Sequence, residues 1–185
     1  MSAPVPAPDT TVVRRGTADD AAMLAGLAAR TFSETFAADN RADDMAAYLS
    51  AHFAPGIQRA EIADPAHTYL VAERAGEPVG FALAREGSAP SCVGDGATVE
   101  IARIYVDRAW FGRGVAPALM DACIAEAHRR GARTLWLGVW ERNPRAIAFY
   151  RKCGFRDVGT QRFRLGQDDQ TDRVMTLELS EGNAR

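Results

Sequence analysis

The sequence is poor in cysteine, and its cysteines form no recognisable pair. Its 185 residues contain three, Cys92, Cys123 and Cys153, at wide spacing and without a C-x-x-C motif. An odd number at such spacing argues against a disulfide framework. The three histidines are scattered along the chain, so no group of residues has the spacing of a metal site. We therefore expect neither disulfides nor a metal.

An excess of basic residues and a long apolar run are also absent. The 22 basic and 24 acidic residues give a formal net charge of -2, whereas a general nucleic-acid binder carries a basic excess. No apolar run approaches the roughly 18 residues of a membrane span. The first ten residues, MSAPVPAPDT, lack the basic start and apolar segment of a secretory signal. These absences predict a cytoplasmic protein that binds neither nucleic acid nor membrane.

The composition is sufficient for one well-packed domain. Hydrophobic residues make up 47% of the chain and charged residues 25%, which is ordinary for a globular protein. The prolines and small residues of the first ten positions predict a flexible tail over 1–10. We expect one domain over 11–180 and a short C-terminal tail over 181–185.

Periodicity and capping residues predict strands and helices in alternation. Helices are expected at 21–36 and 43–53, between Gly114 and Gly131, and at 143–155. Strands are expected at 11–17, in a hairpin over 68–86, and at 99–106, 134–140, 157–165 and 173–179. This order predicts an α/β domain with a mixed central sheet of about six to seven strands, flanked by about four helices. The crossovers 106–134 and 140–157 each carry a helix, which favours parallel neighbours.

A turn with two glycines follows the strand VEIARIYV and precedes a helix, in the stretch WFGRGVAPAL. Such a turn offers backbone N–H groups to a phosphate. A P-loop is excluded because no Gly-Lys-Ser/Thr follows. The dinucleotide fingerprint fits poorly, because Pro117 occupies its third glycine position. An ordinary strand–helix link is the remaining structural alternative.

Two segments resemble the GNAT superfamily of N-acetyltransferases. The stretch 111–116, FGRGVA, matches Gly114 and Ala116 of the acyl-CoA-binding pattern Q/R-x-x-G-x-G/A. The stretch 143–155, NPRAIAFYRKCGF, matches the family's N-x-x-A-x-x-x-Y-x-x-x-G-F segment. Phe111 departs from the pattern, because the family commonly has Gln or Arg there. The resemblance extends from about 12 to 179.

The resemblance implies acetyl-CoA as cosubstrate, with its pyrophosphate on the amides of about 112–117. It further implies a bulge on the strand 99–106, main-chain bonds from Ile104 and Val106 to pantetheine, and an oxyanion donor at or next to Val106. Arg113, Arg151 and Lys152 are phosphate candidates, although most basic side chains are simply solvated. Asn143 is equally well explained as a helix cap. The cofactor-binding candidates are Ile104, Tyr105, Val106, Phe111, Gly112, Arg113, Gly114, Val115, Ala116, Asn143, Ala146, Tyr150, Arg151 and Lys152.

Two catalytic residues follow from the same resemblance. Tyr150 is the candidate acid for the leaving thiolate, although it would also fit the buried face of its helix. Glu100 is the candidate base, because strand alternation places it with Ala102, Ile104 and Val106 on one otherwise apolar face. A structural ion pair is the alternative for Glu100, and other relatives relay the proton through water.

A covalent route through cysteine is less well supported. Cys153 lies three residues from Tyr150, but no histidine is near it in sequence to activate it. Cys123 falls on the core face of its helix, where a free cysteine behaves as a small hydrophobe. We therefore expect direct transfer in a ternary complex.

The acceptor site is expected between the first two helices and the late hairpin. Phe32, Phe36 and Tyr48 are the substrate-binding candidates. The stretch 31–49 resembles a bacterial subgroup that includes spermine/spermidine acetyltransferases, through Thr31, Phe32, Thr35, Phe36, Asn40, Asp44, Met45, Tyr48 and Leu49. The acidic residues Glu34, Asp39, Asp43 and Asp44 would suit a cationic amine, or they could form a solvated helix face.

These observations predict an acetyl-CoA-dependent N-acetyltransferase that acts on the primary amine of a small molecule, with a polyamine as leading candidate. Acetylation of a protein or peptide amine is a second hypothesis. A third is a non-catalytic acyl-CoA sensor, which would need the glycine loop but neither Tyr150 nor Glu100. The chain could function as a homodimer.

Overall fold

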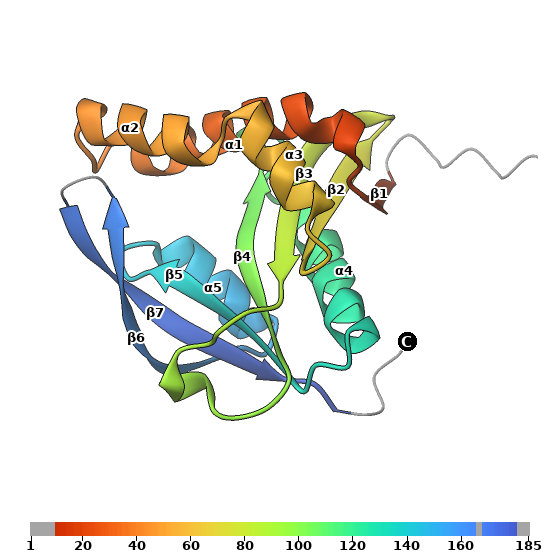
Figure 1. The fold of residues 1–185 in the computed structure, drawn as a ribbon, viewed down its shortest axis with the longest axis vertical. Coiled ribbons are helices and arrows are strands. Elements are labelled where there is room, and N and C mark those ends of the chain that lie inside the picture. The colour runs from red at the N-terminus through yellow and green to blue at the C-terminus, as the bar shows by residue number, and fades with distance from the viewer. Residues whose placement is uncertain (1–9, 166–167, 181–185) are drawn as a thin grey trace, which may run out of the picture.

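One mixed sheet of seven strands organises the chain in the computed structural model, which describes residues 10–165 and 168–180 (Figure 1). The strand order is β1-β2-β3-β4-β5-β7-β6. The strands are β1 (Thr11–Arg15), β2 (His67–Arg74), β3 (Glu77–Arg85), β4 (Thr98–Val106), β5 (Thr134–Trp140), β6 (Arg156–Leu165) and β7 (Asp168–Glu178). The helices are α1 (Ala21–Phe36), α2 (Ala42–His52), α3 (Pro55–Ala63), α4 (Val115–Arg129) and α5 (Pro144–Lys152). The predicted tail 1–10 lies outside the described residues except for Thr10, and the predicted tail 181–185 lies outside them entirely.

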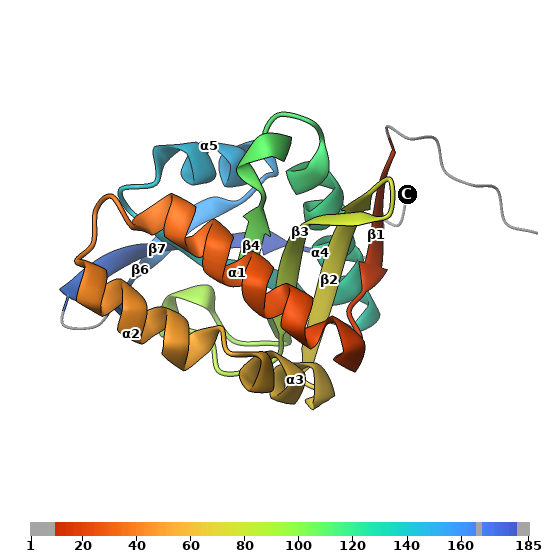
Figure 2. The ribbon, with the colours of Figure 1, turned by 90° about the horizontal axis from the view of Figure 1, so that it is seen from above.

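Helices cover both faces of the sheet (Figure 2). The first three helices lie on one face, where residues such as Leu24 and Phe53 pack with Tyr69 and Phe81 of the sheet. The other two helices lie on the opposite face and bury a second apolar cluster. The chain therefore has three layers, as expected for a mixed α/β sheet.

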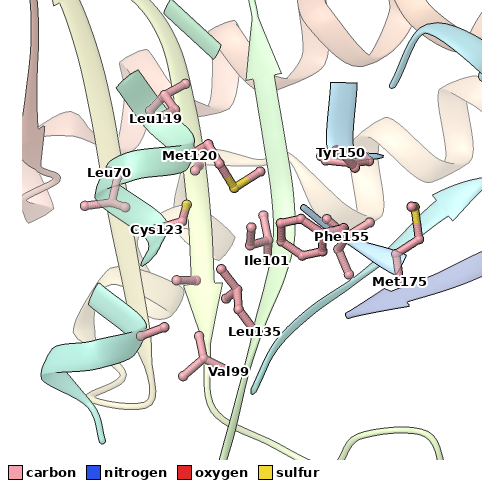
Figure 3. Packing of buried hydrophobic residues seen from close by; sticks show 14 of the residues in the cluster. Leu70, Val99, Ile101, Leu119, Met120, Cys123, Leu135, Tyr150, Phe155 and Met175 are labelled. Atoms are coloured by element: carbon pink, nitrogen blue, oxygen red, sulfur yellow. The ribbon is translucent and has the colours of Figure 1, made fainter. Parts of the chain in front are cut away.

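The core beneath α4 fixes the helix that follows the glycine turn. Leu119, Met120 and Cys123 of α4 point toward β3 and β4 and are at most 1% exposed (Figure 3). Their spacing matches one face of a helix, as the sequence predicted. Tyr150 and Phe155 close the same cluster from α5 and the turn after it. The two helices that carry the predicted motifs thus pack on a common core.

The parallel neighbours β4 and β5 separate along their length. They pair at three positions only, Thr98 with Thr134, Val99 with Leu135 and Glu100 with Trp136. Beyond these positions the two strands diverge, as Figure 1 shows. The remaining six residues of β4 therefore have no ladder partner in β5, and one edge of β4 is left open inside the sheet.

A bulge in β4 lies at the start of this opening. Leu83 pairs with Arg103 and Ala84 pairs with Ile101, so Ala102 is the extra residue. The expected bulge is confirmed. An extra residue changes the face onto which the following side chains point. Ala102 therefore packs in the α1–α3 layer, whereas Ile104 and Val106 pack against the α4–α5 cluster.

Three sequence expectations need correction. Helix α3 was not predicted; Pro55 begins it, but few apolar residues follow at helical spacing. Strand β6 does not neighbour β5, because β7 inserts antiparallel between them. Strand β7 begins at Asp168, five residues before the expected 173, because its polar first residues pair with β6 in a long hairpin.

Within the described ranges, no helix has both the length and the apolar character needed to cross a bilayer.

Candidate active site

The glycine turn at the start of α4 presents a set of free main-chain donors. Gly112 and Gly114 have φ angles of +73° and +82°, a left-handed conformation that favours glycine. Among the described residues, no acceptor binds the amides of Gly112, Gly114, Val115 or Ala116. These amides lie at a helix N-terminus, where the helix dipole also favours an anion. The chemistry of these free amides is therefore suited to a phosphate group.

A cavity of about 490 Å³ extends from this loop toward α5. It lies between the open end of β4, the glycine turn and the buried side of α5. Its lining includes predicted and additional residues: Ile104, Val106, Trp110, Phe111, Gly112, Gly114, Val115, Ala116, Pro117, Arg145, Ala146, Phe149, Tyr150 and Lys152. Ten of the fourteen predicted cofactor-binding residues are thus brought together in one place. Tyr105, Arg113, Asn143 and Arg151 are not among the lining residues.

The four predicted residues outside the lining have other contacts. Tyr105 points into the α1–α3 layer. Arg113 stacks on Trp110, with 5.5 Å between its guanidinium carbon and the ring centroid. Asn143 caps α5 by accepting a hydrogen bond from the Ala146 amide at 3.1 Å. Arg151 forms an ion pair with Asp157 at 2.7 Å.

Arg145 is a basic residue at the cavity that sequence analysis did not select. Its guanidinium lies over the Phe111 ring, 3.9 Å from the centroid. Arginine stacks well on aromatic faces. Phe111, which departs from the Gln or Arg of the acyl-CoA-binding pattern, thus supports a positive charge beside the cavity. Arg145 and Lys152 are the two basic residues that line the cavity.

A second, smaller cavity of about 140 Å³ lies across β4 from the first. Phe32, Phe36 and Tyr48 all line it; the ring of Phe32 lies 4.5 Å from that of Phe36 and 4.7 Å from that of Tyr48. Ile104 and Tyr150 line both cavities. The two spaces therefore meet at these two side chains.

Tyr150 holds its phenol at this junction. The residue is 8% exposed, and among the described residues its hydroxyl forms no hydrogen bond. Burial raises the pKa of Tyr150, and the neighbouring thiols of Cys123 and Cys153 add to the rise. The phenol therefore stays protonated near neutral pH and can donate a proton or a hydrogen bond into the cavity.

Comparisons with known proteins agree with this geometry. The sequence profile of the Acetyltransferase (GNAT) family matches residues 29–155. An uncharacterised N-acetyltransferase of Mycobacterium bovis is 36% identical over 160 residues, which cover 86% of this chain and 98% of the relative. The chain belongs to the GNAT acetyltransferase family. It is an acetyl-CoA-dependent acyltransferase.

Solved structures of GNAT proteins share the fold. The PaiA N-acetyltransferase of Thermoplasma acidophilum, in complex with coenzyme A, superposes with a TM-score of 0.73 at 16% identity, covering 91% of this chain and 99% of that one. The YncA protein of Salmonella typhimurium, solved with its cofactor acetyl-CoA, gives a TM-score of 0.63 at 24% identity, covering 95% of this chain and 98% of that one. A ribosomal protein bS18-alanine N-acetyltransferase of Escherichia coli is 33% identical, over 41% of this chain and 51% of the relative.

The residues of this GNAT acetyltransferase fit its acyl donor. Free amides and two basic side chains suit the phosphates. The open edge of β4 offers main-chain groups to amides of an extended ligand arm. Acetyl-CoA supplies the activated acyl group when bound, and Tyr150 lines both cavities next to this arm.

Glu100 lies outside both cavity linings. It accepts a hydrogen bond from Arg85 at 2.6 Å, at the last position where β4 and β5 still pair. The prediction that Glu100, Ala102, Ile104 and Val106 share one face is wrong, because the bulge at Ala102 reverses the alternation. The role of Glu100 as base stays a prediction.

Sequence analysis missed the polar residues of β7 that line the second cavity, Gln170 and Asp172. Gln170, Asp172 and Val174 are buried at every second position. That alternation was a usable signal, because a carboxylate on the inward face of a strand requires an explanation. It was overlooked because the strand was expected to begin at 173.

None of the four predicted acidic residues lines the second cavity. Asp43 and Asp44 lie in the first turn of α2, where carboxylates favour the helix dipole. Glu34 and Asp39 line a separate polar depression of about 420 Å³ near Arg108 and Arg142. Across 10–165 and 168–180, no three His, Cys, Asp or Glu side chains form a group that could hold a metal ion. The expected absence of a metal stays a prediction.

Proposed function

We propose that this acetyltransferase transfers an acetyl group from acetyl-CoA to the primary amine of a small molecule, directly and in a ternary complex. The junction of the two cavities carries the proposal. One cavity begins at free amides suited to phosphate, the other is small and aromatic, and Ile104 and Tyr150 line both. An amine in the small cavity would thus face a thioester that lies along β4.

The residues around the junction match the needs of amide formation. The amine nitrogen must lose a proton before it can attack, because an ammonium is not a nucleophile. The carbonyl oxygen needs donors as it becomes anionic, and main-chain N–H groups at the end of β4 are suitable. The leaving sulfur benefits from a proton, which the Tyr150 phenol can donate.

The cysteines give no support to a covalent intermediate. Cys123 is fully buried on the core-facing side of α4, and burial raises the pKa of its thiol to about 12. Burial also raises the pKa of Cys153, so neither is an activated thiolate. Direct transfer is therefore the simpler route.

The acceptor within this class is proposed as a cationic amine, and the end of a polyamine is one candidate. The subgroup resemblance in 31–49 supports it, and so does an acidic residue in the cavity. A peptide α-amine is the second candidate, supported by the partial relationship to the ribosomal protein alanine acetyltransferase. The cavity of about 140 Å³ is smaller than a peptide needs, which favours a small molecule.

One assay tests the proposal. The protein is incubated with acetyl-CoA and a panel of butylamine, spermidine and an Ala-initiated tripeptide, and the free thiol is followed. Turnover of the small amines supports the proposal, and turnover of the tripeptide alone favours the protein acetyltransferase. Saturable acetyl-CoA binding without turnover of any amine favours the sensor. A cytoplasmic location, a homodimer and the absence of nucleic-acid or membrane partners stay proposals from the sequence.

A further inference from the structure

The acceptor cavity is an aromatic cage with one buried carboxylate. Eight of its lining side chains are aromatic: Phe32, Phe36, Tyr48, Phe53, Tyr105, Trp140, Tyr150 and Phe163. Asp172 is the acidic residue among them. Aromatic faces attract cations through the ring quadrupole, and a carboxylate adds a charge of the opposite sign. The lining is therefore suited to a cation rather than to a neutral apolar group.

The position of the Asp172 side chain is fixed by residues of the two neighbouring strands. It is 8% exposed and lies in β7 between Trp140 of β5 and Gln161 of β6. The Gln161 amide donates a hydrogen bond to it. Gly138 leaves room for both, since a Cβ there would lie 2.5 Å from Gln161 Nε2 and 3.2 Å from Asp172 Oδ2. None of the ion pairs among the described residues includes Asp172.

The other charged groups around the cage do not neutralise Asp172. Arg103 of β4 lines the cage, but it is bound to both carboxylate oxygens of Glu61 in α3, at 2.7 and 3.0 Å. Tyr48 of α2, Tyr105 of β4 and Tyr150 of α5 have pKa values raised by burial, so these phenols are neutral. Asp172 therefore gives the cage its net negative charge.

We propose that Asp172 binds the ammonium of the acceptor and accepts the proton that the amine must lose. This inference rests on the proposed function. Asp172 replaces Glu100 as base because it lines the cavity that holds the amine, whereas Glu100 is outside it and paired with Arg85. Burial in the cage would lower the pKa of the ammonium, which helps the transfer.

Acetyl transfer proceeds by deprotonation of the ammonium, attack on the thioester and protonation of the leaving sulfur. One proton passes from the ammonium nitrogen to a carboxylate oxygen of Asp172. The nitrogen lone pair then forms the C–N bond to the thioester carbonyl carbon, and the C–S bond breaks with its electron pair on sulfur. Tyr150 gives its proton to the sulfur and regains one from the amide nitrogen. The proton on Asp172 is released to solvent, so one amide, one thiol and one proton are formed.

The size of the cage defines the substrate class. A cavity of about 150 Å³ in another protein holds one benzene molecule, and this one measures about 140 Å³. It therefore accommodates an ammonium and a short apolar segment of about benzene size. An aminobutyl end of a polyamine or a small monoamine has these dimensions. A second charge close to the nitrogen would be placed among rings without a partner.

The experiment compares Asp172→Asn with Asp169→Asn, an exposed carboxylate on the same strand. With butylamine, we expect kcat/KM to fall by about 10²-fold or more in Asp172→Asn and to stay near wild type in Asp169→Asn. Calorimetry with butyltrimethylammonium, which cannot be acetylated, should show at least about tenfold weaker binding in Asp172→Asn. Acetyl-CoA affinity should be equal in all three proteins.

The pH profile separates a base from a structural residue. Burial raises the pKa of Asp172 to about 6, while the Gln161 hydrogen bond lowers it. The kcat/KM of the wild type should therefore decrease as the pH falls through about 6, because the carboxylate becomes protonated. Gln161→Met removes a bond to the charged form, so this acid limb should move to higher pH. In Asp172→Asn the limb should be absent.

Two results would overturn the inference and are distinguishable from failure of the proposed function. Unchanged kcat/KM and ammonium binding in Asp172→Asn, with an active wild type, exclude Asp172 and leave the function intact. If the acid limb of kcat/KM lies at the same pH in Gln161→Met as in the wild type, Asp172 is likewise excluded as the base and the function is left intact. A wild type that acetylates none of the amines contradicts the function itself, and the inference fails with it.

Discussion

At the scale of the residue, the site depends on side chains whose chemistry is set by burial. Tyr150 satisfies two demands at once: its ring fills the core beside Phe155, and its hydroxyl reaches the junction of the cavities. The sequence predicted Tyr150 because its motif occupies one short, continuous stretch of the chain, 143–155. Alternation along β7 could mark Asp172 as inward-facing, but its place at the second cavity depends on the pairing of β7 with both β5 and β6, which are contacts far apart in the chain.

Replacement of Tyr150 by Phe tests the acid. The ring and its packing are retained, and only the hydroxyl is lost. We expect kcat to fall by about 10²-fold, because protonation of the leaving sulfur becomes unassisted. The dissociation constant of acetyl-CoA, measured by calorimetry, should stay nearly unchanged. An unaltered kcat would remove Tyr150 from the mechanism.

Replacement of Glu100 by Gln tests the base that the sequence favoured. Glu100 is paired with Arg85 and lies outside both cavities, so we expect kcat/KM and its acid limb to stay near wild type. Steady-state kinetics from pH 5 to 9 would check this. A strong loss of rate together with the acid limb would restore Glu100 as the base and contradict the role of Asp172.

At the scale of the element, strand β4, the glycine turn and α4 form one unit. The order of strand, turn and helix could be predicted from periodicity and from two glycines, because both signals are local. A bulge in this strand followed from the family resemblance, but its position at Ala102 and its effect on the faces of the strand did not. Helix α3 was missed because its sequence has little apolar periodicity, so its place depends on contacts such as those of Gln58 and Glu61 with Tyr69.

Replacement of Gly114 by Ala tests the turn. The φ of +82° is unfavourable for alanine, at a cost of about 1–2 kcal/mol. If the turn rearranges to relieve this strain, its free amides move, so we expect weaker acetyl-CoA binding by calorimetry together with a lower free energy of unfolding.

Gly26→Ala is the matched control. Gly26 lies within α1 with open space around it. Alanine there should stabilise the protein by about 0.5–1 kcal/mol and leave acetyl-CoA binding unchanged. Equal cofactor affinity in Gly114→Ala and the wild type would contradict the assignment of the phosphate to this turn.

At the scale of the whole molecule, a buried ion cluster joins elements that are distant in sequence. Glu126 of α4 has a side chain that is 4% exposed, and it binds Arg15 of β1, Thr68 of β2, and Arg129 and Arg130 at the end of α4. Burial alone would raise the pKa of Glu126, but the hydrogen bonds from these partners lower it to about 2. The cluster fixes α4 against the first two strands.

Replacement of Glu126 by Gln should lower the free energy of unfolding by about 2–3 kcal/mol at pH 7, because the buried Arg130 loses its main partner. The folded-state pKa is below the ordinary 4.5, so this contribution is present above pH 4.5 and is lost as the pH falls toward 2. Urea unfolding at pH 7 and pH 3 measures both. A difference between variant and wild type that does not narrow at pH 3 would contradict this account.

The short pairing between β4 and β5 affects how firmly the two halves of the sheet are joined. Three residue pairs join the strands β1–β4 to the strands β5–β7 within the sheet, and beyond them the backbone of β4 faces open space. An extended ligand arm in that space would act as an extra strand and link the two halves. The amides of this part of β4 that point away from β3 should then exchange hydrogen rapidly in the free protein and slowly once coenzyme A is bound. Bound coenzyme A would thus stabilise the sheet by bridging its two halves.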